Sequence, residues 1–347
     1  MHLDIAPRPQ RRLLAWLVLP LTLAVAIFLL IRFYEIPSVV DPNPLAIALI
    51  VLLTGLLLAG SVAAAYCILP GADGNRSVGQ LYLVVTASLA ANYSTPVKAG
   101  IPLRIYLYKR FMGIGIATGS ALVGLEVLLG MLVPAVIALF ALVLLLPEGG
   151  PVVPAVVAAG AGLAIAALAF VRSGSYDRVI PRLPLAGIAR RAIAPDGDIV
   201  TAMRGVPLWS LGAAAGIYAA MFVLLGVRTL YAFQLFGGSL NVMELVGISA
   251  AAFALGFVSF VPMGLGVRDA TLVALFVQAG ADRDVAIAVA ALDRLLSTGV
   301  PFLLGLLSAQ ILGLRSVLAP KDREAQTAVV ESPLDDSPVP QPAGRQS

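Results

Sequence analysis

The sequence predicts an all-α polytopic membrane protein with about six full transmembrane helices and two re-entrant helical hairpins, arranged as an inverted repeat. The prediction rests on composition, on six long apolar runs, and on two apolar stretches broken by glycine, proline and charge. Hydrophobic residues make up 60% of the 347 residues and charged residues 12%, whereas soluble domains carry about 45–50% apolar and about 25% charged residues. The mean hydropathy of +0.97 also excludes a water-soluble globular enzyme.

Six apolar runs are long enough to cross a bilayer. The shortest are about 19 residues long and span about 28 Å as helices, close to the hydrocarbon thickness of about 30 Å. Basic residues precede the first run and no small-residue cleavage site follows it, so we expect a retained helix rather than a cleaved signal. The six runs are Leu13–Ile31, Pro44–Leu69, Gly119–Leu146, Val152–Val171, Pro207–Leu225 and Ala286–Leu312.

Two further apolar stretches, Gln80–Arg110 and Glu244–Gly280, are interrupted. Broken backbone at membrane depth is tolerated only where it is buried in protein or lines a wet cavity. We therefore expect each stretch to form two short helices that enter and leave on one side. The residues expected to shape the backbone of these hairpins are Asn92, Pro96 and Gly100 in the first, and Pro262, Gly264 and Gly266 in the second.

The distribution of basic residues tests this topology, because cytoplasmic loops are enriched in Lys and Arg. Loop 172–204 carries six arginines, and the segment after Leu312 is also basic, whereas loops 32–43 and 147–151 are poor in basic residues. Six spans and two hairpins place every loop on its expected side. Counting each hairpin as a single crossing would place loop 172–204 outside.

An internal repeat is predicted from the spacing of the interrupted stretches. Pro96 precedes Gly100 by the same interval as Pro262 precedes Gly266, and an acidic residue follows each proline at nearly the same distance. Each half holds three full spans and one hairpin, so the second half is expected to be inverted; chance similarity of two Gly/Pro-rich loops is the alternative. The expected organisation is a cytoplasmic N-terminus (1–12), a first repeat (13–146), a second repeat (147–315) that includes loop 172–204, and a disordered cytoplasmic tail (316–347).

Charged side chains at membrane depth are the candidate functional residues, because each costs about 2.5–3.5 kcal/mol at a helix centre. Arginine binds phosphate bidentately, and glycine-rich turns before short helices attract anions. Structural ion pairs are the alternative: a pair of Glu126 across the repeat interface, and a pair of Arg294 with Glu126 or Asp269. For Lys98 the alternative is contact with cytoplasmic headgroups. The expected phosphate-binding residues are Lys98, Arg104, Arg268 and Arg294, and the expected charge-balancing or proton-linked residues are Glu126, Asp269 and Asp293.

Other site types are not expected. The chain has one histidine, His2, and one cysteine, Cys67, which leaves no His-based or Cys-based metal cluster. Neither a P-loop nor a dinucleotide fingerprint is present, so we expect no cofactor, no metal and no ATP-driven transport by this chain. The small formal net charge of +4 gives no reason to expect a nucleic-acid partner.

The two motifs resemble those of the flippase-like family, the transmembrane region of lysylphosphatidylglycerol synthases and their stand-alone relatives. The first motif is Asn92-Tyr-Ser-Thr-Pro96-Val-Lys-Ala-Gly100-Ile-Pro-Leu-Arg104 followed by Glu126. The second is Pro262-Met-Gly-Leu-Gly266-Val-Arg268-Asp269 followed by Asp293-Arg294. The resemblance covers roughly residues 10–315. Ile101 stands where the family usually has an acidic residue, and Asp269 stands where it has glutamate.

The resemblance implies movement of an anionic lipid or a polyprenyl-phosphate-linked lipid between leaflets of a bacterial inner membrane. The distribution of basic residues predicts that both termini are cytoplasmic. The missing carboxylate at Ile101 weakens the expectation of proton coupling there. No soluble synthase domain is visible after Leu312, so lysyl transfer is not expected. Two alternatives remain: a membrane-embedded transferase acting on a lipid phosphate, and a scaffold for a glycosyltransferase or synthase.

Overall fold

The computed structural model describes residues 43–69, 77–94, 99–145, 198–259, 264 and 266–313, and every regular element among them is a helix. The predicted spans Leu13–Ile31 and Val152–Val171 and the predicted tail 316–347 lie outside the described residues. Of loop 172–204, the structure describes the start of α9, which runs from Asp198 to Gly205.

Long apolar helices form the frame of the described chain. They are α2 (Pro44–Ile68), α5 (Ile116–Leu145), α10 (Leu208–Leu235) and the continuous run of α13 (Arg283–Arg294), η3 (Leu295–Gly299) and α14 (Val300–Ile311). Within the described residues, these four are long and apolar enough to cross a membrane. They correspond to four of the six predicted spans. Asn43 caps α2 by accepting from the Leu45 N–H, with Pro44 at the first helical position.

Helix α10 continues well past Leu225, where the sequence predicts the span to end, and stops at Leu235. Within this extension Arg228 is buried at 2% exposure and pairs with the Asp293 carboxylate. Because the charge is compensated inside the protein, it does not terminate the apolar helix.

Both interrupted stretches form two short helices, as predicted. The first contains α3 (Val78–Ser94) and α4 (Gly100–Met112), and the second contains α11 (Val242–Val258) and α12 (Val267–Gln278). With 17, 13, 17 and 12 residues, these helices are about 18–26 Å long, shorter than a hydrocarbon core of about 30 Å. Re-entry into one side of the membrane stays a prediction.

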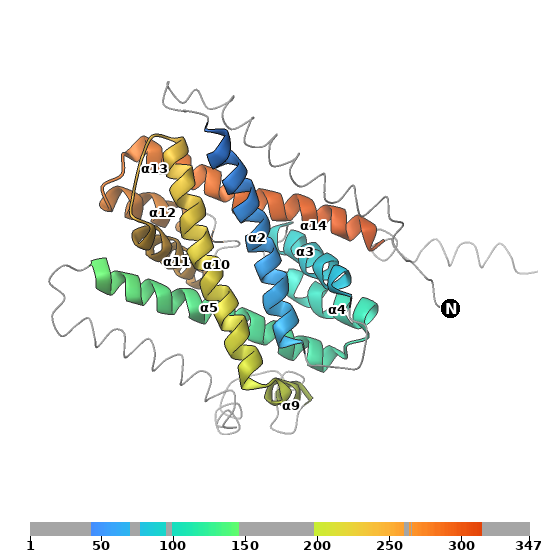
Figure 1. Cartoon of the computed structure of the whole chain (residues 1–347). Coiled ribbons are helices and arrows are strands. Elements are labelled where there is room, and N and C mark those ends of the chain that lie inside the picture. The colour runs from blue at the N-terminus through green and yellow to red at the C-terminus, as the bar shows by residue number, and fades with distance from the viewer. Residues whose placement is uncertain are drawn as a thin grey trace, which may run out of the picture.

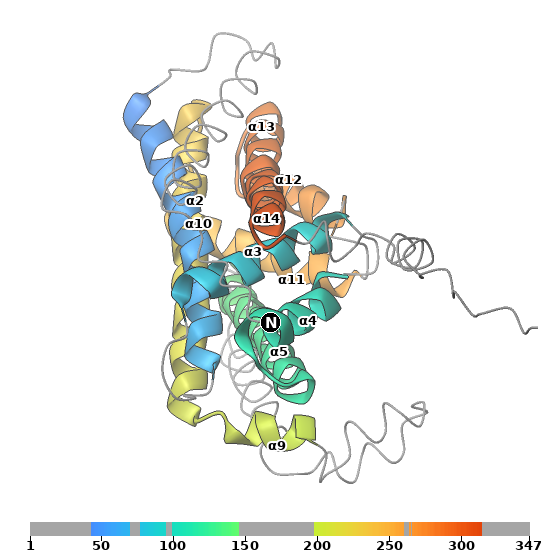
Figure 2. The same cartoon turned by 90° about the vertical axis from the view of Figure 1, so that its right-hand side faces the viewer.

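The helices pack in a reciprocal pattern. In Figure 1, α2 and α10 run side by side, and α5 and α14 cross them obliquely. Figure 2 shows the α2–α10 pair along one side of the described helices, with α4, α12, α13 and α14 on the other and α3 reaching from α2 towards them. The first short helix of each pair packs against a long helix from the other half of the chain: α3 against α14, and α11 against α5.

Glycines allow the closest of these contacts. A Cβ at Gly305 of α14 would lie 2.3 Å from the Thr86 carbonyl oxygen of α3. A Cβ at Gly247 of α11 would lie 2.1 Å from the Ala141 Cβ of α5. Both distances are shorter than van der Waals contact, so a larger residue would push the helices apart.

Apolar side chains cover much of the outer surface of the long helices. In water such exposure would be unfavourable, whereas in a bilayer these side chains contact lipid. This surface supports a multi-pass membrane protein. The exposed residues include Leu45, Leu52, Leu56, Trp209, Val223, Leu303 and Leu306.

Candidate functional site: an arginine-lined cavity

A cavity of about 430 Å³ opens where the long helices meet both pairs of short helices. Its lining is mostly apolar, with residues such as Leu57, Val123 and Phe257. Among the described residues, four arginines also line it, one each from α4, α10, α12 and α13: Arg104, Arg228, Arg268 and Arg294. The cavity thus combines an apolar wall with a concentration of positive charge.

Arg104 and Glu126 form the first ion pair, between α4 and α5. Arg104 NH1 donates to Glu126 Oε2, and Arg104 Nε donates to the Ser88 hydroxyl at 2.8 Å. The Tyr108 hydroxyl donates to Glu126 Oε1 at 3.1 Å. Glu126 is buried, so its carboxylate lies inside the bundle.

Gly100 brings α3 and α4 close enough for this arrangement. A Cβ at position 100 would lie 2.0 Å from the Ser88 carbonyl oxygen and 2.5 Å from the Asn92 side chain. Because α4 begins at Gly100 against this part of α3, Arg104, one turn further along, reaches the Ser88 hydroxyl. The close packing of the first helix pair therefore positions its arginine.

Asp293 is the centre of the second ion cluster. Its Oδ1 accepts from Arg228 NH2 at 2.5 Å, and its Oδ2 accepts from Arg268 NH2 at 2.6 Å. The Ser297 hydroxyl accepts from Arg228 NH2 at 2.9 Å and donates to Asp293 Oδ1 at 3.2 Å. One buried carboxylate thus joins α10, α12 and α13. Breaking such a pair by removing one partner typically costs about 3–5 kcal/mol.

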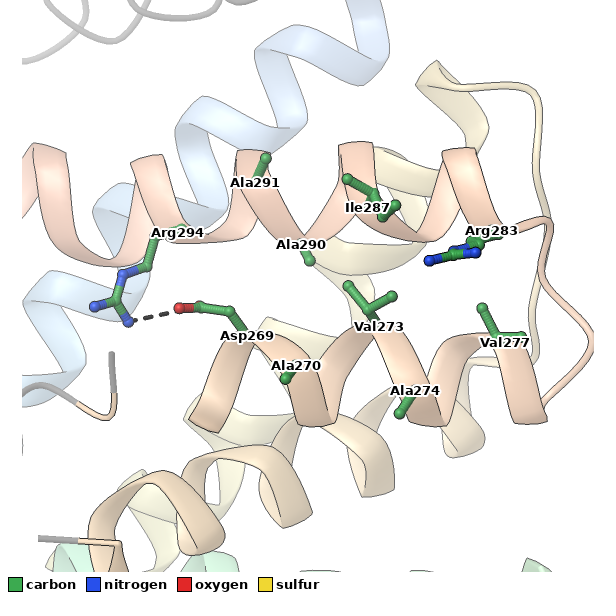
Figure 3. Close-up of a pocket in the computed structure, with 10 residues that line it drawn as sticks. All are labelled: Asp269, Ala270, Val273, Ala274, Val277, Arg283, Ile287, Ala290, Ala291 and Arg294. Atoms are coloured by element: carbon green, nitrogen blue, oxygen red, sulfur yellow. Dashed lines mark ion pairs between the residues drawn. The ribbon is translucent and has the colours of Figure 1, made fainter. Parts of the chain in front are cut away.

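Asp269 and Arg294 form a third pair at the edge of the cavity, with Arg294 NH1 3.6 Å from Asp269 Oδ1 (Figure 3). Asp269 Oδ2 also accepts from the Gly266 N–H at 3.3 Å, which caps the start of α12. Gly266 has a φ of +78°, a conformation that glycine adopts without strain. This pair is one of the two structural pairings that the sequence allows for Arg294.

Adjacent Asp293 and Arg294 reach different partners, as expected from the 100° step of a helix. Asp293 contacts Arg228 and Arg268, whereas Arg294 contacts Asp269. The π-helical turn η3 begins at the next residue and carries Ser297 towards the Arg228 guanidinium. Single π turns inside α-helices are frequent at functional sites.

The seven charged side chains of these clusters carry a net formal charge of +1. They are Arg104, Glu126, Arg228, Arg268, Asp269, Asp293 and Arg294. The Arg268 Nε–H is buried and has no hydrogen-bond partner among the described residues. The Asn92 Oδ1 is likewise buried and has no partner among them. Buried polar groups normally have partners, and both residues line the cavity. The Arg268 Nε–H is thus a donor, and the Asn92 Oδ1 an acceptor, that no described residue satisfies.

The structure brings together six of the charged residues singled out in the sequence, and Asn92, Gly100 and Gly264 also line the cavity. Lys98, Pro96 and Pro262 lie outside the described residues. Sequence analysis missed Arg228, because it follows the predicted end of its span. The apolar sequence that resumes after it, Leu230-Tyr-Ala-Phe233, is the signal that could have placed it inside a helix. It also missed Tyr108 and Ser88, which carry no pattern beyond single polar residues.

Comparison with known proteins indicates the family of the chain. The family model described as the lysylphosphatidylglycerol synthase TM region matches residues 12–305. A UPF0104 membrane protein from Pyrococcus horikoshii is 32% identical over 87 residues, which are 24% of this chain and 26% of that protein. The matched part therefore spans about a quarter of the length of that curated relative.

Proposed function

Because the chain belongs to the family of the lysylphosphatidylglycerol synthase TM region, we propose that it moves an anionic lipid between the leaflets of a membrane. A lipid linked to a polyprenyl phosphate is part of the same proposal. The observation that carries it is the arginine-lined cavity inside an apolar helix bundle. The proposed setting is a bacterial inner membrane, with both termini in the cytoplasm.

The proposed ligand group is a phosphate. Arginine binds phosphate through paired N–H donors, and its charge is permanent. Arg268 offers a buried Nε–H without a partner among the described residues, on the same guanidinium that holds Asp293. Arg104 and Arg294 would contribute further phosphate-binding donors from α4 and α13. The carboxylates of Glu126, Asp269 and Asp293 would keep the arginines oriented and balance their charge when no lipid is bound. Lys98 is proposed to add a further positive group.

The helix contacts support an inverted repeat. Such a repeat would give the cavity two equivalent routes of access, one from each side of the membrane. If α2–α5 correspond to α10–α14, the packing of α3 on α14 corresponds to that of α11 on α5, and α2 and α10 pair with each other. Mutual contacts of this kind are what a two-fold relation produces. The ion pairs follow the same relation, because the second short helix of each pair contributes an arginine to a carboxylate on the next long helix: Arg104 to Glu126 and Arg268 to Asp293. Transporters commonly bind substrate where two such repeats meet.

Transport of a fluorescent phosphatidylglycerol across the membrane of proteoliposomes tests the proposal. We expect the wild-type protein to move the lipid faster than protein-free vesicles, and Arg268→Gln and Arg104→Gln to slow it by about tenfold or more. Loss of one charge-assisted hydrogen bond costs about 1.5–3 kcal/mol, and 1.4 kcal/mol is a factor of ten.

Arg110→Gln is the matched control, because Arg110 is an exposed arginine at the end of α4, outside the cavity lining. It should leave the rate unchanged. Folded variants that transport as fast as wild type would contradict the site. A covalently altered lipid in the vesicles would instead favour the transferase.

A further inference from the structure

A second hollow, of about 760 Å³, lies between α12 and α13 (Figure 3). Its volume is within the range of about 300–1,000 Å³ that is typical of ligand sites. The middle of this groove is apolar, and both ends are charged, with Arg283 at one end and the Asp269–Arg294 pair at the other (Figure 3). The apolar lining consists of Ala270, Val273, Ala274 and Val277 from α12 and Ile287, Ala290 and Ala291 from α13.

The length of the groove matches one leaflet. Arg283 and Arg294 are the first and last residues of α13, so they are about 16 Å apart along the axis at 1.5 Å per residue. This is about half of a hydrocarbon core of about 30 Å. The Arg283 end belongs to an exposed polar turn that contains Gly280, Asp282 and Asp284, as expected at a membrane surface. The groove therefore extends from a surface towards the middle of the membrane.

The groove and the arginine-lined cavity share one lining residue. Arg294 lines both spaces, and its contact with Asp269 lies between them. The pair has a separation of 3.6 Å, and both side chains are partly exposed.

The charge at the surface end suits a lipid phosphate. Arg283 is exposed and lines the groove, and its side chain extends along it (Figure 3). The neighbouring Asp282 turns its carboxylate to the backbone, where Oδ1 accepts from the N–H groups of Asp284 and Val285. Neither Asp282 nor Asp284 belongs to the lining. The positive guanidinium is thus the charged group presented to an occupant at this end.

We propose that the groove between α12 and α13 is a docking site for a phosphate-bearing membrane lipid, with its phosphate at Arg283 and one hydrocarbon tail along the groove as far as the Asp269–Arg294 pair. This inference rests on the proposed function, because it makes the groove the place from which lipid enters the cavity. With both termini in the cytoplasm, as proposed, the Arg283 end of the groove faces the outer side of the membrane. The lipid then enters the groove from the outer leaflet.

Photo-crosslinking tests the docking site. The full-length protein would be reconstituted in vesicles of phosphatidylethanolamine and phosphatidylglycerol with a trace of phosphatidylglycerol that carries a diazirine in the middle of one tail. Mass spectrometry of peptides then maps the labelled positions. We expect labels to concentrate on α12 and α13, and Arg283→Gln to lower this labelling about threefold or more. Ala274→Trp, at an exposed position in the groove, should abolish it.

Ala63→Trp on α2 is the matched control for bulk, because Ala63 is exposed and lines neither space, and Arg110→Gln is the control for charge. Labels spread evenly over the lipid-facing helices, or unchanged by both groove variants, would mean that bulk lipid fills the groove and would overturn the inference. Transport measured on the same vesicles separates the two proposals. Labelling in the groove without transport contradicts the proposed function alone, and transport without labelling in the groove contradicts the docking site alone.

Discussion

Arg268 donates to the Asp293 carboxylate at 2.6 Å and so ties α12 to the long helix that follows it. In the other half of the chain, Arg104 ties α4 to α5 through Glu126. The two contacts differ in one respect, because Asp293 also holds Arg228 of α10, whereas Glu126 holds a tyrosine hydroxyl. Each of these contacts can stabilise the fold, bind lipid or do both, and the variants below distinguish these roles.

Asp293→Asn is predicted to destabilise the protein more than Glu126→Gln. The first change leaves two buried arginines without their carboxylate, and the second leaves one partly buried arginine. Loss of one partner from a buried pair costs about 3–5 kcal/mol. Thermal unfolding in detergent should give the lowest Tm for Asp293→Asn. Asp284→Asn, at an exposed position, should match wild type, and equal Tm values for all three would contradict the burial of these charges.

Combining Arg104→Gln with Glu126→Gln is predicted to recover stability but not transport. The double variant leaves no unpaired charge, and a neutral replacement of a buried ion pair is often tolerated. Its Tm should exceed that of either single variant, while its rate of phosphatidylglycerol transport stays at the level of Arg104→Gln. Recovery of both properties would show that the pair is structural and that Arg104 does not bind lipid.

Gly247→Ala and Gly305→Ala are each predicted to lower stability by about 1–3 kcal/mol, the usual cost of overpacking. The new methyl group would meet Ala141 in the first case and the Thr86 carbonyl oxygen in the second. Gly124→Ala on α5 is the control, because nothing lies within 4 Å of its Cβ position. It should be neutral or slightly stabilising, since alanine favours helix. Similar losses at 247 and 305 are expected from the reciprocal packing, and a loss at only one of them would argue against it.

Arg228→Lys is predicted to reduce stability although it keeps the charge. The Arg228 guanidinium contacts the Asp293 carboxylate, the Ser297 hydroxyl and the Thr54 hydroxyl at 3.4 Å. A lysine ammonium cannot reproduce this planar set of donors. A lower Tm than wild type is expected in thermal unfolding. Arg110→Lys, at the exposed end of α4, should unfold like wild type.

Much of the described fold follows from the sequence. The family inferred from the motifs around Pro96 and Pro262 is confirmed by the match over residues 12–305. Glycine, proline and charge inside apolar sequence correctly indicated two pairs of short helices, because backbone breaks at membrane depth leave few other solutions. The divergence of Asp293 and Arg294 followed from helix geometry alone.

The identity of most ion pairs could not be predicted. Arg228 and Asp293 are far apart in sequence, and only the packing of α10 against α13 brings them together. The π turn at Leu295–Gly299 also has no clear local signal, since it depends on how the helix packs against its neighbours. The groove between α12 and α13 was missed for a related reason. Small residues such as Ala270, Ala274 and Ala290 look like ordinary helix-packing positions until the space between the helices is known.

Native mass spectrometry of copurified lipid tests the central claim, that the arginine-lined cavity holds an anionic lipid, most directly. The wild-type protein would be compared with the double variant Arg104→Gln/Glu126→Gln and with Arg110→Gln after identical purification. We predict that one phosphate-bearing lipid is enriched on the wild-type and Arg110→Gln proteins relative to the membrane extract, and is lost from the double variant. The same mixture of bulk phospholipids on all three proteins would contradict the claim.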